Sequence, residues 1–145
     1  MELVRCTLAA EGELRSLAAQ SYPLEGCGIL IGHTQHPSSG TPLVVEAIAG
    51  HNLVRDRARD RYELDPLDIL AAERRARDHH MDVVGFWHTH PDHPAEPSGF
   101  DTERAWADYV YVICSTVPEG VMDMRWWRLR SEGGEFVELA VAPPD

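Results

Sequence analysis

Residues 83–90 read VVGFWHTH, an apolar run that ends on two histidines, and they set the architecture expected of the chain. The run is short and rich in β-branched and aromatic residues, which favours a strand over a helix. Side chains alternate across a strand, so His88 and His90 would share one face with Cα atoms about 6.6 Å apart. Two imidazoles at this spacing can chelate a metal ion. The pair alone is a weak indication, because the chain has eight histidines.

The residues that follow this strand offer a third ligand. A proline-rich loop, residues 91–97, leads into a short helix expected from Ser98 to about Asp108. Asp101 would lie in the first turn of that helix, where its carboxylate can point back toward the end of the strand. Two imidazoles and one carboxylate leave a fourth position open, as in catalytic zinc sites. The spacing S-x-x-D is also that of a capping box, and both roles can hold at once.

A second apolar strand is predicted at residues 26–32, which read GCGILIG. Glu25 precedes it and would share the face of Cys27 and Ile29. A carboxylate at the start of an apolar strand is more typical of a solvated strand end than of a catalytic base, so its position alone assigns no role to Glu25. A polar turn at residues 33–41 and an apolar run at residues 42–49 together predict a hairpin.

The remaining pattern completes an α/β domain. Helices are expected at residues 11–20 and 66–78, the second with Asp65 as its cap and with Leu67 and Leu70 on its apolar face. A charged loop at residues 55–61, a short strand at residues 62–64, a strand at residues 109–117 and an antiparallel pair at residues 124–130 and 135–141 are also expected, the pair turning at residues 133–134. No repeat or composition shift marks a second domain, so we expect residues 1–145 to form one domain with a curved, mostly antiparallel mixed β-sheet flanked by helices.

Composition excludes several classes of partner. The 24 acidic and 13 basic residues give a formal net charge of −11, which would repel nucleic-acid phosphates and anionic lipids. No stretch of about 20 apolar residues predicts a membrane-spanning helix, and the N-terminus lacks the apolar core of a secretory signal. The three cysteines form no close pair, which predicts reduced thiols and a cytoplasmic protein.

Five polar positions together resemble a known signature. Three stretches match the pattern E…H-[S/T]-H-x7-S-x-x-D: Glu25 in EGCGILIG, His88 and His90 in HTHP, and Ser98 and Asp101 in SGFD, with seven residues between His90 and Ser98. The chain therefore resembles the JAMM (MPN-plus) zinc metalloprotease family, in its compact prokaryotic branch. The resemblance runs from Glu25 to Asp101, and the order of flanking elements extends it over most of the chain. It implies the JAMM/MPN fold, which is similar to that of cytidine deaminases.

The resemblance also implies a catalytic centre. One Zn²⁺ per chain, with a catalytic water, would be held by His88, His90 and Asp101. Glu25 would take the proton of that water and deliver it to the leaving amine. Ser98 would stabilise the charged tetrahedral intermediate. The side chain of Thr89, by contrast, would point away from the metal and serve the structure.

The family relation further implies a substrate class. We expect hydrolysis of the amide bond after the C-terminal Gly-Gly of a ubiquitin-like or sulfur-carrier protein. The sequence does not choose the carrier, the preference for a peptide or an isopeptide bond, or the oligomeric state. Two alternatives stay open: a zinc amidohydrolase acting on a small amide, and a non-catalytic MPN scaffold. A zinc deaminase is disfavoured because the P-C-x-x-C ligand pair is missing.

Overall fold

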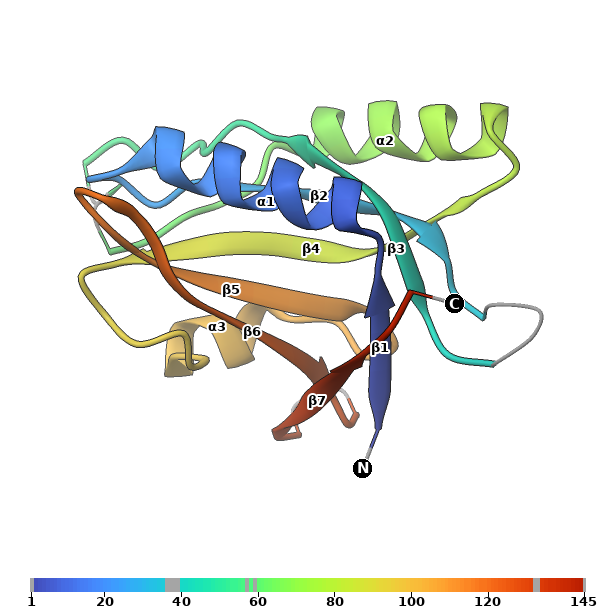
Figure 1. The fold of residues 1–145 in the computed structure, drawn as a ribbon. Coiled ribbons are helices and arrows are strands. Elements are labelled where there is room, and N and C mark those ends of the chain that lie inside the picture. Colours follow the sequence, from blue (N-terminus) through green and yellow to red (C-terminus); the bar gives the residue numbers. More distant parts are fainter. Residues whose placement is uncertain (1, 36–39, 57, 59, 132–133, 145) are drawn as a thin grey trace.

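The computed structural model describes residues 2–35, 40–56, 58, 60–131 and 134–144. Within these residues seven strands form one mixed sheet in the order β1-β3-β2-β4-β5-β6-β7, which closes on itself (Figure 1). The strands are β1 (Leu3–Cys6), β2 (Cys27–His33), β3 (Leu43–Ala49), β4 (Asp82–Pro91), β5 (Val110–Val117), β6 (Gly120–Leu129) and β7 (Phe136–Ala142).

Four of the strand pairs are antiparallel and three are parallel. The antiparallel pairs are β2–β3, β2–β4, β5–β6 and β6–β7, and the parallel pairs are β4–β5, β1–β3 and β1–β7. The expected curved, mostly antiparallel mixed sheet is therefore confirmed. Closure by β1 was not expected, because its four residues are too few to show a period of two.

Three helices accompany the sheet in the described part of the chain: α1 (Leu8–Ser21), α2 (Pro66–Asp78) and α3 (Gly99–Arg104). Ala10, Leu14 and Ala18 of α1 pack into a core with Leu30 of β2 and Trp87 of β4. The neighbouring side chains of the same strands point to the opposite face. There Ile29, Ile31 and Phe86 form a second core with Ala72 and Ala76 of α2. The two long helices thus cover opposite faces of β2 and β4.

Two helix limits differ clearly from those expected, the start of α1 and the end of α3. Helix α1 begins at Leu8 rather than near residue 11, because the Thr7 side chain accepts a hydrogen bond from the Ala10 N–H and caps it. Helix α2 begins at Pro66 with Asp65 as its cap, as predicted. Helix α3 ends at Arg104, four residues before the predicted limit.

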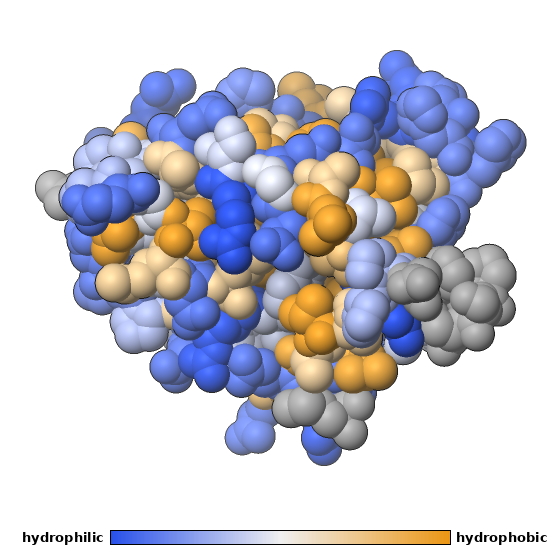
Figure 2. All heavy atoms as spheres, in the orientation of Figure 1, coloured by the Kyte–Doolittle hydropathy of each residue, from blue (hydrophilic) through white to orange (hydrophobic). Residues whose placement is uncertain are grey.

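The apolar face predicted for α2 is partly wrong. Leu67 and Leu70 are 70% and 62% exposed, whereas Ala72 and Ala76 are buried. The helix approaches the sheet on its small residues, which allow the backbones to lie close together, and this turns the two leucines outward. On the face shown in Figure 2, hydrophobic side chains are likewise interspersed with hydrophilic ones at the surface.

Other expectations are met only in part. The predicted strand at residues 62–64 is reduced to a single bridge between Asn52 and Leu64. The hairpin of β2 and β3 and the antiparallel pair of β6 and β7 are confirmed. Their connecting turns lie partly outside the described residues, at positions 36–39 and 132–133. Among the described helices, none has both the length and the apolar character needed to cross a membrane.

Candidate metal centre

Three buried side chains converge where β4 ends beside the start of α3. The Nε2 atoms of His88 and His90 are 3.2 Å apart. The Oδ2 atom of Asp101 lies 3.2 Å from the first and 3.0 Å from the second. All three residues are buried. The two histidines share a face because one residue separates them on β4, and the Thr89 hydroxyl between them instead accepts a hydrogen bond from the Gly26 N–H.

The three donor atoms suit a tetrahedral zinc ion. Zinc bound by nitrogen and oxygen at about 2.0–2.1 Å in tetrahedral geometry places its ligand atoms roughly 3.3 Å apart. The edges of 3.2, 3.0 and 3.2 Å match that spacing. Two imidazole nitrogens and a carboxylate oxygen are also ligands that zinc prefers. His88, His90 and Asp101 can therefore hold a metal ion.

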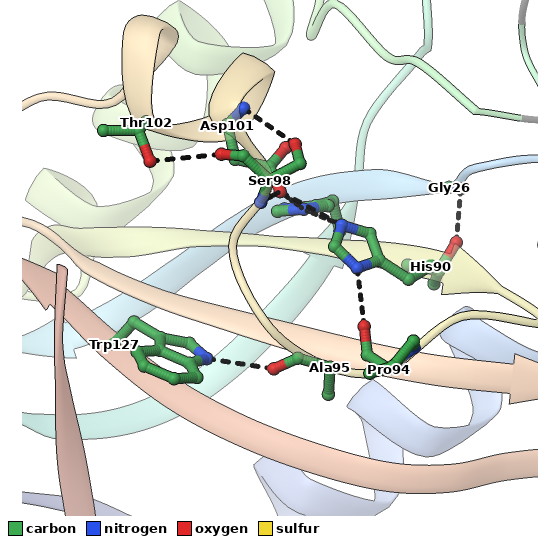
Figure 3. A network of polar contacts seen from close by, with 10 residues as sticks. Gly26, His90, Pro94, Ala95, Ser98, Asp101, Thr102 and Trp127 are labelled. Carbon is green, nitrogen blue, oxygen red and sulfur yellow. Dashed lines mark hydrogen bonds and ion pairs between the residues drawn. The ribbon is translucent and has the colours of Figure 1, made fainter.

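The ring of His90 is oriented by the loop that follows β4. Its Nδ1 lies 2.8 Å from the Pro94 carbonyl oxygen, so this nitrogen carries a proton, and a metal ion would bind Nε2 in place of the proton that Nε2 shares with Asp101 (Figure 3). Two further donors hold the loop in place. The Trp127 indole N–H donates to the Ala95 carbonyl, and the Ser115 hydroxyl donates to the His93 carbonyl.

Burial and mutual contacts shift the pKa values of the three ligand residues. Burial lowers the pKa of His88 and outweighs the attraction of Asp101. Burial also disfavours the charged form of His90, but the hydrogen bonds to Asp101 and Pro94 outweigh it and raise the His90 pKa. For Asp101 burial opposes ionisation, and the hydrogen bonds from His88, His90 and Ser98 hold its pKa far below the usual range. The cluster thus favours a charged carboxylate beside neutral His88.

Asp101 is placed by the cap of α3. The Ser98 Oγ accepts a hydrogen bond from the Asp101 N–H at 3.0 Å, and the Asp101 Oδ2 accepts one from the Ser98 N–H at 2.9 Å. This reciprocal pair is the capping box that the spacing predicts. Because the Oδ2 atom that caps the helix also faces the histidines, the cap fixes the third ligand atom.

Glu25 and Ser98 lie beside this cluster. Together with His90 they line a cleft of about 310 Å³, whose other lining residues are Asp60, His93, Pro94 and Glu96. Glu25 is buried, and burial raises its pKa to about 8, helped by the charges of Asp101 and Asp60 and opposed by that of His90. A carboxyl group with such a pKa can both accept and donate a proton near neutral pH.

The structure thus brings all five predicted polar residues to one place, and it adds residues that the sequence pattern did not reveal. Tyr62 stacks on the ring of His88, with ring centroids 4.5 Å apart. Trp127 supports the loop after β4. Asn52 contacts the backbone of Glu25. Only tertiary packing brings these three to the site, so spacing could not have identified them.

Comparison with known proteins gives matches over nearly the whole chain. Residues 8–130 match the family described as prokaryotic homologs of the JAB domain. A protein named desampylase, from Haloferax volcanii, is 40% identical over 148 residues, which cover 95% of this chain and 96% of that protein.

Solved structures with the same fold span several organisms. A protein from Desulfitobacterium hafniense superposes with a TM-score of 0.79 at 25% identity, and one from Salinibacter ruber with 0.76 at 33% identity. Each covers 97% of this chain and 92% of the other. A JAB1/MPN domain protein from Archaeoglobus fulgidus, at 19% identity, gives a TM-score of 0.52 over 98% of this chain and 99% of that one, which supports the shared fold.

Proposed function

Because the chain belongs to the prokaryotic JAB domain family, we propose that it is a zinc-dependent isopeptidase or peptidase acting on a ubiquitin-like or sulfur-carrier protein. The bond cleaved would be the amide after the C-terminal glycines of that protein. One observation carries the proposal. Three buried candidate ligand atoms lie 3.0–3.2 Å apart, and one of their residues, His90, lines the same cleft as Glu25 and Ser98.

His88, His90 and Asp101 would hold the metal ion. A zinc ion bound there supplies a Lewis acid that polarises an amide carbonyl and makes water a stronger acid. The chain's own residues orient two of these side chains, His90 and Asp101. Pro94 fixes which nitrogen of His90 carries the proton, and the Ser98 N–H fixes which oxygen of Asp101 faces the two rings.

Glu25 would move the proton of the reaction. Its buried carboxylate accepts a proton from the attacking water and then delivers it to the nitrogen of the leaving amine. Its pKa of about 8 suits both steps, because a group that titrates near the working pH gives up and takes up a proton with little cost. Asp60, which lines the same cleft, helps to keep that pKa high.

Ser98 would stabilise the charge that develops on the carbonyl oxygen. Its Oγ already accepts a hydrogen bond from the Asp101 N–H, which leaves the hydroxyl proton free to point into the cleft. A neutral donor held in this way binds an oxyanion more strongly than a carbonyl, so it lowers the barrier rather than only binding substrate.

The proposed substrate class rests on two findings. A desampylase is 40% identical to this chain over almost the full length of both proteins. The cleft is also lined by the acidic side chains of Asp60 and Glu96, which favours a neutral or basic tail over an acidic one. Cys6, Cys27 and Cys114 are buried free thiols, which supports the cytoplasm as the place of action.

The test is a cleavage assay read by mass spectrometry. The zinc-loaded protein is incubated with β-grasp carrier proteins that bear a C-terminal extension or a lysine-linked partner, and the cut bond is identified. We expect a single cut after the terminal glycine, lost on chelation of the metal. Glu25→Gln should keep zinc and lose at least about a hundredfold in kcat. Cleavage of a small amide only would refute the substrate class, and full activity of the Gln variant would remove Glu25 from the mechanism.

A further inference from the structure

The backbone of Glu25 is held by a loop rather than by the sheet. Glu25 lies two residues before β2 begins. Its N–H donates to the Ala58 carbonyl at 2.5 Å, and its carbonyl accepts a hydrogen bond from the Asn52 Nδ2 at 3.2 Å. Ala58 and Asn52 both belong to the connection between β3 and α2. The next residue, Gly26, is joined to Thr89 of β4 by two hydrogen bonds, so the position of this carboxylate depends both on β4 and on how that connection is fixed.

Asn52 fixes the connection with every hydrogen-bonding group of its side chain. Besides the bond to Glu25, its Nδ2 donates to the Arg61 carbonyl at 3.1 Å. Its Oδ1 accepts from the N–H groups of Val54 and Glu63, at 3.0 and 2.9 Å. An amide side chain has two donor protons and two acceptor lone pairs, so all four are used. Two carbonyls on one side and two N–H groups on the other also define which way the amide points.

Two of these bonds enclose Tyr62. Arg61 and Glu63, its neighbours on either side, are both bound by Asn52. The ring of Tyr62 stacks on His88 with an interplanar angle of 24°. A metal-ligating histidine usually donates its second N–H to an acceptor that orients the ring. The Nδ1 of His88 is buried and has no such partner among the described residues, so the stacked Tyr62 takes over that orienting role.

We propose that Asn52 is a positioning residue for the reaction, which sets Glu25 directly and His88 through Tyr62. One side chain thereby fixes the distance between the proton-transfer group and a ligand of the proposed metal. The inference rests on the proposed function for the role of Glu25, whereas the orientation of His88 can be measured without any reaction.

The loop should survive loss of this side chain. Its two ends are joined by backbone hydrogen bonds, from the Leu53 N–H to the Glu63 carbonyl at 2.8 Å and from the Asp65 N–H to the His51 carbonyl at 3.0 Å. Variants of Asn52 are therefore expected to fold, with the part of the loop between these bonds less ordered. This makes it possible to separate positioning from stability.

Two substitutions and a control isolate the effect. Asn52→Ala removes all four hydrogen bonds. Asn52→Asp keeps an acceptor for Val54 and Glu63 but removes both donors, and so releases Glu25 and Arg61. His51→Ala is the matched control, because the neighbouring His51 side chain is 81% exposed and bonds only to Asp68 among the described residues. Each variant is compared with the wild type for thermal unfolding, zinc affinity by chelator competition, kcat and KM, and the NMR shifts of the His88 ring protons.

We expect both Asn52 variants to lower kcat about 10–100-fold with KM changed little, and to weaken zinc binding about tenfold. The His88 ring protons should lose the ring-current shift caused by Tyr62 in both. A purely structural role through Oδ1 instead predicts that Asn52→Asp matches wild type, and this result would overturn the proposal. If wild type cleaves no carrier yet the variants still weaken zinc binding and shift the His88 resonances, the positioning role stands and the proposed reaction fails.

Discussion

Gly85 lies where β4 approaches β5 too closely for any side chain. It pairs with Val110 in the parallel ladder of these two strands. A Cβ atom at this position would overlap the Val110 carbonyl oxygen and lie 2.7 Å from the carbonyl carbon and 3.0 Å from the nitrogen. All three atoms belong to backbone, so no side-chain rotation can relieve the overlap. Gly85→Ala must therefore force the strands apart.

The cost can be worked out from these contacts. Overpacking in a closed core costs about 1–3 kcal/mol, and two strained ladder hydrogen bonds add roughly 1 kcal/mol each. We expect Gly85→Ala to lose about 3–5 kcal/mol of the free energy of unfolding. His88 follows three residues later on the same strand and pairs with Ile113 of β5, so zinc binding should weaken as well.

The assay is urea unfolding of both the zinc-loaded and the chelated protein. Gly12→Ala in α1 is the control, since a Cβ there meets no atom within 4 Å. The control should gain about 0.5–1 kcal/mol, because alanine is the better helix former. A loss below about 1 kcal/mol for Gly85→Ala, with an unchanged urea slope, would show that the spacing of β4 and β5 does not exclude a side chain at this position.

Three further predictions concern charge, thiols and metal. The hydrogen bonds and charge of Arg75 lower the pKa of Glu46, so this pair should stabilise the fold above pH 4.5 and lose that effect as the pH falls through the lower folded pKa. Glu46→Gln should unfold more easily than wild type at pH 7, and urea unfolding at a series of lower pH values should show this difference shrinking as the pH falls below 4.5. Burial raises the pKa of Cys6, Cys27 and Cys114 to about 12, so a thiol reagent at pH 8 should label none of them until the protein is unfolded. A chelator should abolish hydrolysis while the circular dichroism spectrum stays that of a folded protein, and a loss of secondary structure would contradict this.

The parts of the molecule that depend on local sequence could be predicted. His88 and His90 lie on one face of β4 because side chains alternate along a strand. The contact between Ser98 and Asp101 follows from the spacing of a capping box. Glu25 is 63 residues before His88 in the printed sequence, and only the resemblance associated it with the site. In the structure β2 pairs with β4 so that Cys27 lies opposite His88, and this pairing is the reason that Glu25, two residues before Cys27, lies near the histidines.

The parts that depend on tertiary packing could not be predicted. The outward turn of Leu67 and Leu70 depends on how closely α2 approaches the sheet, which periodicity does not encode. The closure of the sheet by β1 requires partners from both ends of the chain. The contact of Tyr62 with His88 could not be predicted for the same reason. Residues 62–64 show a strand pattern, but in the structure this segment pairs only through the bridge of Leu64 with Asn52.

The three ligand atoms are placed by interactions that do not need a metal ion. Strand alternation directs both imidazoles, the Pro94 carbonyl orients one ring, and the cap of α3 holds the Asp101 carboxylate. The two hydrophobic cores lie on the two faces of the sheet and contain none of these ligands. We therefore expect packing of these cores to stabilise the fold without the free energy of metal binding, unlike in small zinc-dependent domains. A metal ion bound there would keep one coordination position for substrate chemistry, because the protein would supply only three ligands and already holds all three in place.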